Sequence, residues 1–97
     1  MTRDGDMARL VRVWDSILAA GITSQRQKLE SGHHVQVGMG HGRRDPRHEW
    51  WWANITWPGR DLVVHLHLGH DDDAVARVLG RKLCEPGIMR RLRDMMP

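Results

Sequence analysis

Apolar residues recur at three- and four-residue spacing over residues 6–20, a pattern that predicts an amphipathic helix. Gly21 follows directly, as expected just past a helix end. The apolar stripe of this helix comprises Met7, Leu10, Val11, Trp14, Ile17 and Leu18.

Two further helices are predicted near the other end of the chain. The first covers residues 74–83 and follows three aspartates (71–73), which suit a helix start because they accept hydrogen bonds from its free N–H groups. The second covers residues 88–96, after a break at residues 85–87. The apolar positions are Val75, Val78, Leu79 and Leu83 in the first, and Met89, Leu92 and Met96 in the second.

A period of two over residues 49–57 and 62–68 predicts a β-hairpin around the Pro-Gly turn at residues 58–61. A two-residue or a four-residue loop keeps the same side chains on the same face of the hairpin, so the register stays open between them. The apolar face, which we expect to pack on the first helix, comprises Trp51, Ala53, Ile55, Trp57, Leu62, Val64, Leu66 and Leu68. The opposite face comprises Trp50, Trp52, Asn54, Thr56, Val63, His65 and His67.

Residues 22–39 predict another hairpin, with its turn at Ser31 and Gly32. Residues 33–39 alternate like a half-buried strand, whereas residues 23–30 are almost all polar and form an edge strand or merely extended chain. A basic loop follows at residues 40–48. The fold class expected is therefore α+β, a single domain over residues 1–97 with an antiparallel sheet of three to four strands, one N-terminal helix and two C-terminal helices.

The composition indicates the compartment and the origin of this protein. The single cysteine, Cys84, excludes an internal disulfide, and no apolar run approaches the length of a membrane span, so a soluble cytoplasmic protein is expected. Five Trp with no Phe or Tyr, and Arg in large excess over Lys, indicate a GC-rich bacterial or phage genome. The net charge of +3 permits contact with nucleic acid without favouring it.

The mixed face of the hairpin is the first candidate for function, since exposed Trp-rich patches usually mark a partner site. We expect a protein partner to contact Trp50, Trp52, Asn54, His65 and His67, or a second copy of the chain to form a homodimer there. The alternative is that a helix covers this face. A Trp-rich face that binds a partner favours a small non-enzymatic binding or regulatory protein, of inhibitor or accessory type, without a cofactor. No Ser-His-Asp, Cys-His or paired-carboxylate arrangement is evident.

Two other sets of residues carry alternative functions. Arg43, Arg44 and Arg47 of the basic loop could hold phosphates of a nucleic acid. His65 and His67 recur two residues apart on one strand face, a spacing that can present two zinc ligands, with His70 available from the strand end.

The segment from Gly21-Ile22-Thr23 to Gly32-His33-His34-Val35 resembles the HicA-type toxins, small α-β-β-β-α ribonucleases with a histidine in a Gly-Ser-His-His segment. The resemblance implies an RNA-directed activity with His34 as the catalytic histidine. The chain departs from the family pattern at Ser31-Gly32, where the order is inverted, and it does not match the later histidine-containing strand of the family.

Overall fold

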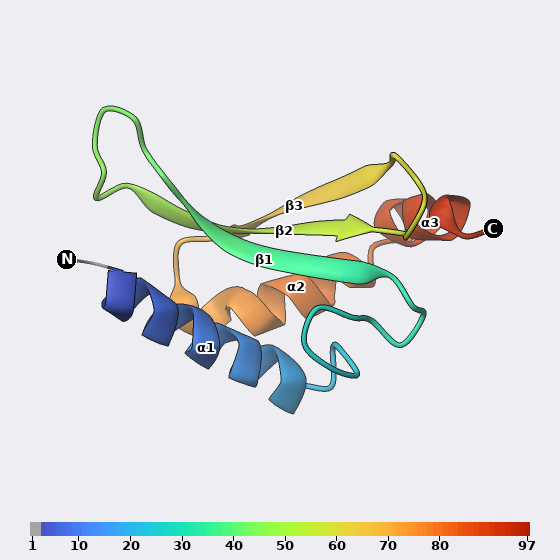
Figure 1. Cartoon of the computed structure of the whole chain (residues 1–97), viewed down its shortest axis with the longest axis horizontal. Helices are drawn as coiled ribbons and strands as arrows, with labels where there is room; N and C mark the ends of the chain where they lie inside the picture. Colours follow the sequence, from blue (N-terminus) through green and yellow to red (C-terminus); the bar gives the residue numbers. More distant parts are fainter. Residues whose placement is uncertain (1–2) are drawn as a thin grey trace.

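The structure, a computed structural model, describes residues 3–97 and confirms the α+β class. The elements follow in the order α-β-β-β-α-α, as Figure 1 shows. They are α1 (Arg3–Ala19), β1 (His34–His41), β2 (Glu49–Thr56), β3 (Val63–Gly69), the short 3₁₀ helix η1 (Asp72–Ala74), α2 (Val75–Leu83) and α3 (Pro86–Met95).

The three strands form one antiparallel sheet in the order β1-β2-β3. The predicted β2–β3 hairpin is confirmed, and pairing of Thr56 with Val63 selects the four-residue loop of the two registers. The Pro-Gly turn is closed by a 3.0 Å hydrogen bond from the Arg60 N–H to the Trp57 carbonyl. Gly59 adopts a φ of 82°, which a type II turn requires at its third position.

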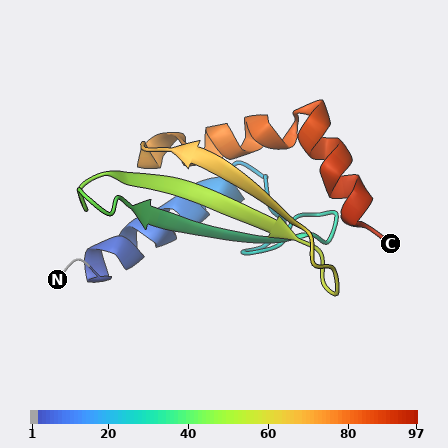
Figure 2. The same cartoon turned by 90° about the horizontal axis from the view of Figure 1, so that it is seen from above.

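The helices lie on one side of the sheet, and in the view onto the sheet no described helix crosses its other side (Figures 1 and 2). The apolar strand face packs against α1, α2 and α3, so the first helix does not cover it alone. The core includes Trp14, Ile17, Val35, Val37, Trp51, Ala53, Ile55, Val64, Leu66, Leu68, Val75, Leu79, Leu92 and Met95.

Arg9 joins three of these elements through side-chain hydrogen bonds. Its guanidinium donates twice to Asp72 of η1, at 2.8 and 2.9 Å, and to Glu49 of β2 at 3.0 Å. Trp51 Nε1 donates to the same Asp72 carboxylate at 2.8 Å. The hydrogen bonds from Arg9, and then the one from Trp51, hold the pKa of Asp72 below its usual value, while the bond to Asp72 raises the pKa of Arg9.

The predicted stripe of α1 is wrong at its first turns. Met7 and Val11 are 59% and 39% exposed, whereas Val13, which the spacing did not single out, is 2% exposed. An open groove of about 310 Å³, lined by Met7, Leu10, Met39 and Trp51 among others, separates the start of α1 from the sheet. The helix therefore buries its later turns only.

Two other predictions of buried residues are wrong, one in the β2–β3 connection and one in α3. Leu62 is 53% exposed and Trp57 is only partly buried, because β2 ends at Thr56 and β3 begins at Val63, which leaves both residues in the connection. Helix α3 turns Leu92 and Met95 inward, while Met89 and Met96 are 48% and 39% exposed. Its start at Pro86 fits the preference of proline for the first helical turn.

Residues 23–30 form no strand. They make a compact loop with isolated bridges from Gln25 to Lys28 and from Lys28 to His34, and the Val35 N–H donates to the Gln27 carbonyl at 2.9 Å. His33, next to this loop, is 2% exposed, and its Nε2 lies 2.7 Å from the Leu92 carbonyl of α3. None of the described helices combines the length and apolar character needed to traverse a bilayer.

Candidate functional site

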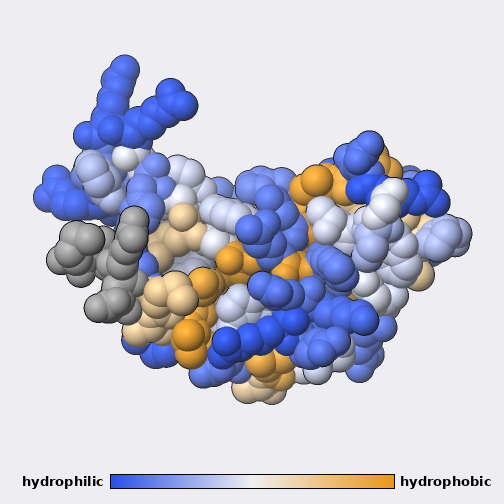
Figure 3. Space-filling view, viewed as in Figure 1, coloured by the Kyte–Doolittle hydropathy of each residue, from blue (hydrophilic) through white to orange (hydrophobic). Residues whose placement is uncertain are grey.

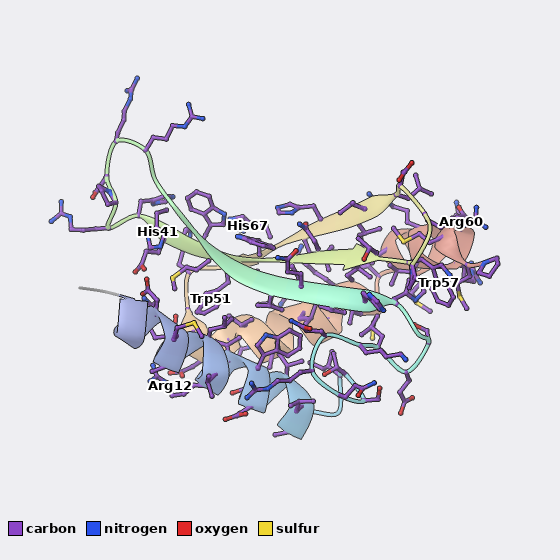
Figure 4. All side chains as sticks on the ribbon, viewed as in Figure 1. Arg12, His41, Trp51, Trp57, Arg60 and His67 are labelled. Atoms are coloured by element: carbon purple, nitrogen blue, oxygen red, sulfur yellow. The ribbon has the colours of Figure 1, made fainter. Side chains whose placement is uncertain are left out.

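The side of the sheet that faces away from the helices is called the outer face below. It gathers the predicted partner-binding residues of β2 and β3, and it adds alternate residues of β1. Figure 4 shows His67 on this side, whereas Trp51 lies on the side toward α1. The strands contribute His34, Gln36, Gly38, Gly40, Trp50, Trp52, Asn54, Thr56, Val63, His65 and His67.

Trp50 and Trp52, the tryptophan pair, lie over two glycines of the neighbouring strand. Gly40 pairs with Trp50 and Gly38 pairs with Trp52 across the β1–β2 ladder. A Cβ on Gly38 would lie 2.3 Å from Cζ2 of Trp52, and one on Gly40 would lie 2.4 Å from Cε2 of Trp50. The indoles therefore occupy the space that β1 side chains would otherwise fill, which fixes them along the sheet.

A second ring continues this surface toward β3. The rings of Trp52 and His65 are nearly parallel, with 29° between their planes and 6.1 Å between centroids. His65 Nδ1 lies 2.6 Å from Asn54 Oδ1, an oxygen that can only accept, so this nitrogen carries the proton. The amide nitrogen of Asn54 is left free to donate to another group.

A row of three imidazoles begins beside Trp50 at the other end of the outer face. The His48 ring lies 5.6 Å from the Trp50 ring and 5.2 Å from that of His70, which in turn is 5.9 Å from His67. His70 Nδ1 donates to the Glu49 carbonyl at 2.5 Å, which orients its ring. The outer face therefore carries two groups of rings, one with Trp50, His48, His70 and His67 and the other with Trp52 and His65.

The predicted zinc ligands do not converge. His65 is directed to Asn54, while His67 lies beside His70 and accepts a 3.3 Å hydrogen bond from the Gly69 N–H. Among residues 3–97, no three His, Cys, Asp or Glu side chains are grouped so that they could hold a metal ion.

The loop between β1 and β2 carries three exposed arginines at the end of the outer face where Trp50 lies. We call residues 42–48 the arginine loop, because Gly40 and His41 of the predicted loop belong to β1. Its hydrophilic side chains stand out from the body of the protein (Figure 3). Hydrogen bonds from the Gly42 N–H to His48 and from the His48 N–H to Asp45 shape the loop.

Charges in this loop are unequally satisfied. Arg47 pairs with Asp45 at 3.1 Å, although its side chain is 92% exposed. Within the part of the chain that the structure describes, no carboxylate pairs with Arg43 or Arg44. Arg60 lies at the opposite end of the sheet, so it forms no common patch with these arginines (Figure 4).

The outer face itself has no acidic side chain from any strand. Glu49, the carboxylate nearest to Trp50 in the sequence, points toward the helices, where it binds Arg9. Asp72 is held by the same guanidinium. Repulsion of an anionic ligand is therefore kept low on this side of the sheet.

A shallow polar pocket of about 270 Å³ opens at the end of the outer face that is far from the arginine loop. We call it the polar pocket; it is lined by Gln27, His34, Val35, Gln36, Asn54 and Thr56. The predicted catalytic residue His34 thus lies on the outer face at the start of β1. No hydrogen bond to its ring is present among the described residues, and its catalytic role stays a prediction.

Several residues of this surface were not identified from the sequence. The sequence signal for Gly38 and Gly40 is a Gly-x-Gly segment that pairs with a Trp-x-Trp segment, and it becomes visible only once β1 and β2 are set in register. Gln27 comes from a loop that no periodicity predicts. His48 comes close to His70 only through the loop shape.

No family model matches the chain, and neither a curated protein nor a solved structure matches it.

Proposed function

We propose that the outer face binds single-stranded nucleic acid, with bases stacked on the tryptophan pair and phosphates held by the arginine loop. The observation that carries this proposal is the placement of Trp50 and Trp52 over Gly38 and Gly40, which holds two indoles along the sheet without covering them with a helix. Stacking of a base on such an aromatic ring contributes about 1–3 kcal/mol and tolerates any base.

Spacing and charge support the same ligand. Trp50 and Trp52 are two residues apart on one strand, which places them roughly 7 Å apart by strand rise. Arg43 and Arg44 stand beyond Trp50, and the strands add no carboxylate to the face. A chain of bases and phosphates can therefore run along β2 from the arginine loop toward the polar pocket.

The direct test is fluorescence anisotropy of labelled 12-nucleotide strands of RNA and DNA at low and moderate salt. The double variant Trp50→Ala with Trp52→Ala should lose at least tenfold in affinity, since each lost stack is worth about 1–3 kcal/mol. Unfolding by urea establishes that this variant still folds. Absence of wild-type binding at low salt, to either polymer, contradicts the proposal.

The arginine loop is tested separately by the salt dependence of binding. Arg43→Ala with Arg44→Ala should reduce the slope of log affinity against log salt by about 1.4, or about 0.7 for each lost phosphate contact. Arg77→Ala with Arg81→Ala removes the same charge from exposed positions on α2 and serves as the control. An equal loss of slope in both variants would mean that only net charge matters.

A protein partner docking on the outer face, as an accessory or inhibitor protein would, is the second candidate. It is favoured by the exposed Val63, 50% exposed at the edge of the face, and by the enrichment of Trp in binding hot spots. A second copy of the chain is one such partner. Sedimentation of the wild type and of the Trp50→Ala, Trp52→Ala variant tests this case. A homodimer through the outer face should sediment as a dimer in the wild type and as a monomer in the variant.

A further inference from the structure

The polar pocket adjoins the tryptophan pair along the path proposed for the nucleic acid. Asn54 follows Trp52 on the same face of β2, and Gln36 pairs with Asn54 across the β1–β2 ladder. The Asn54–Gln36 pair of the pocket therefore lies roughly 7 Å along the strands from Trp52. A strand stacked on Trp52 would bring its next base to this pocket.

Most side chains that line the polar pocket are amides and hydroxyls. Three of them are carboxamides, from Gln27, Gln36 and Asn54, and the pocket contains no Asp, Glu, Lys or Arg. Its lining therefore suits a neutral, polar group rather than a phosphate or a carboxylate, whose burial would need a charged partner. A nucleobase edge is such a group.

The hydrogen-bonding capacity of the pocket is largely unused within the protein. Among the described residues, no hydrogen bond engages the carboxamide of Gln36 or that of Gln27. Asn54 uses only Oδ1, which accepts from His65, and so its amide N–H groups remain available. Gln36 keeps both an acceptor and two donors.

The backbone conformation that places Gln27 at this pocket is energetically unfavourable. Gln27 adopts a φ of 68°, a left-handed conformation that a residue with a side chain seldom takes. Its carbonyl accepts from the Val35 N–H at 2.9 Å, which holds the loop against the start of β1. Strained residues of this kind concentrate at ligand sites.

We propose that the polar pocket reads one base of the bound strand and that it selects adenine. The proposal rests on the proposed nucleic-acid function of the outer face. A carboxamide with a free oxygen and a free amide group pairs bidentately with adenine, accepting from its amino group and donating to a ring nitrogen. Gln36, which pairs with Asn54 across the β1–β2 ladder, retains both, as does Gln27 from the neighbouring loop, and Asn54 supplies a further donor. The volume of about 270 Å³ is just below that of sites for drug-sized ligands, as expected for one base.

The experiment compares binding of 12-nucleotide oligo(rA), oligo(rC) and oligo(rU), with oligo(dA) as a further arm that separates RNA from DNA. Wild type should bind oligo(rA) about tenfold more tightly than oligo(rU), within the discrimination that one bidentate pair gives. Gln36→Ala should bring the ratio close to one, chiefly by lowering the affinity for oligo(rA). The matched control Gln25→Ala removes an exposed carboxamide outside the pocket and should keep the ratio.

The outcomes separate the two proposals. Equal affinity of the wild type for all strands, or a ratio that survives Gln36→Ala, overturns adenine selection and leaves the binding function standing. Binding of none of the strands contradicts the proposed function, and the base pocket with it.

Discussion

Replacing Gly38 by alanine is the sharpest single test of how the outer face is built. The new Cβ would lie 2.3 Å from Cζ2 and 2.8 Å from Cε2 of Trp52, closer than real carbon atoms approach. The backbone of β1 is fixed by its pairing with β2, so the indole must move. Because no described helix covers this face, the ring can swing outward toward water.

The magnitude follows from the surface that the indole loses. A covered Trp buries about 150–250 Å², and if the displaced ring loses about a third of that area, the cost is roughly 1–2 kcal/mol at about 25 cal/mol per Å². Removing a glycine from a strand returns about 0.5–1 kcal/mol of backbone entropy. We therefore expect Gly38→Ala to lower the free energy of unfolding by about 1 kcal/mol, and to weaken nucleic-acid binding by the value of one stack, about 1–3 kcal/mol.

Urea unfolding followed by far-ultraviolet circular dichroism measures the stability, and anisotropy measures the binding. Gly87→Ala is the control, since a Cβ at Gly87 in α3 meets nothing within 4 Å, and its effect should be neutral or stabilising. A Gly38→Ala protein that is as stable as the wild type and binds equally well would refute the described packing of Trp52 on β1.

Three further changes probe other parts of the fold. Asp72→Ala should cost about 2–3 kcal/mol in urea unfolding because it removes the charged partner of Arg9 and the acceptor of Trp51; a cost below about 0.5 kcal/mol would contradict this. The folded-state pKa of Asp72 is lowered, so its carboxylate stabilises the fold above the unfolded pKa near 3.9, and this stabilisation is lost as the pH falls below that value. The free energy of unfolding of the Asp72→Ala variant should therefore differ less between pH 7 and pH 3 than that of the wild type. Thr23→Val should stabilise by about 1 kcal/mol, because the buried Thr23 hydroxyl has no hydrogen-bond partner among the described residues; a shift of the urea midpoint to lower concentration would show that it has one. Gln27→Gly should stabilise by roughly 0.5–1 kcal/mol by relieving the positive φ, and thermal unfolding at an unchanged or lower temperature would rule this out.

The sequence predicts the sheet well because strand periodicity is strict. A one-residue slip would move every side chain to the opposite face, so the alternation over residues 49–68 leaves few choices for Trp51 and Trp52. Helix faces are less tightly specified. In α3, Met89 and Met95 are both apolar and lie on different sides, and only packing against the sheet selects Met95.

The candidate site was predictable only where it depends on one hairpin. Trp50, Trp52, Asn54, His65 and His67 share a face by alternation alone. The glycines beneath the indoles depend on how β1 pairs with β2, a long-range choice that local patterns do not reveal. The polar pocket depends on a loop whose polar sequence has no period, so its residues could not be placed together in advance.

The most direct measurement of the central claim is a ¹H–¹⁵N NMR titration that follows the indole Nε1–H signals as a single-stranded 12-nucleotide RNA is added. Each of the five Trp gives one such signal. The signals of Trp50 and Trp52 should shift together with saturation, whereas that of Trp51 should stay in place because its Nε1 donates to Asp72 on the other side of the sheet. Unmoved Trp50 and Trp52 signals at saturating RNA would contradict the account.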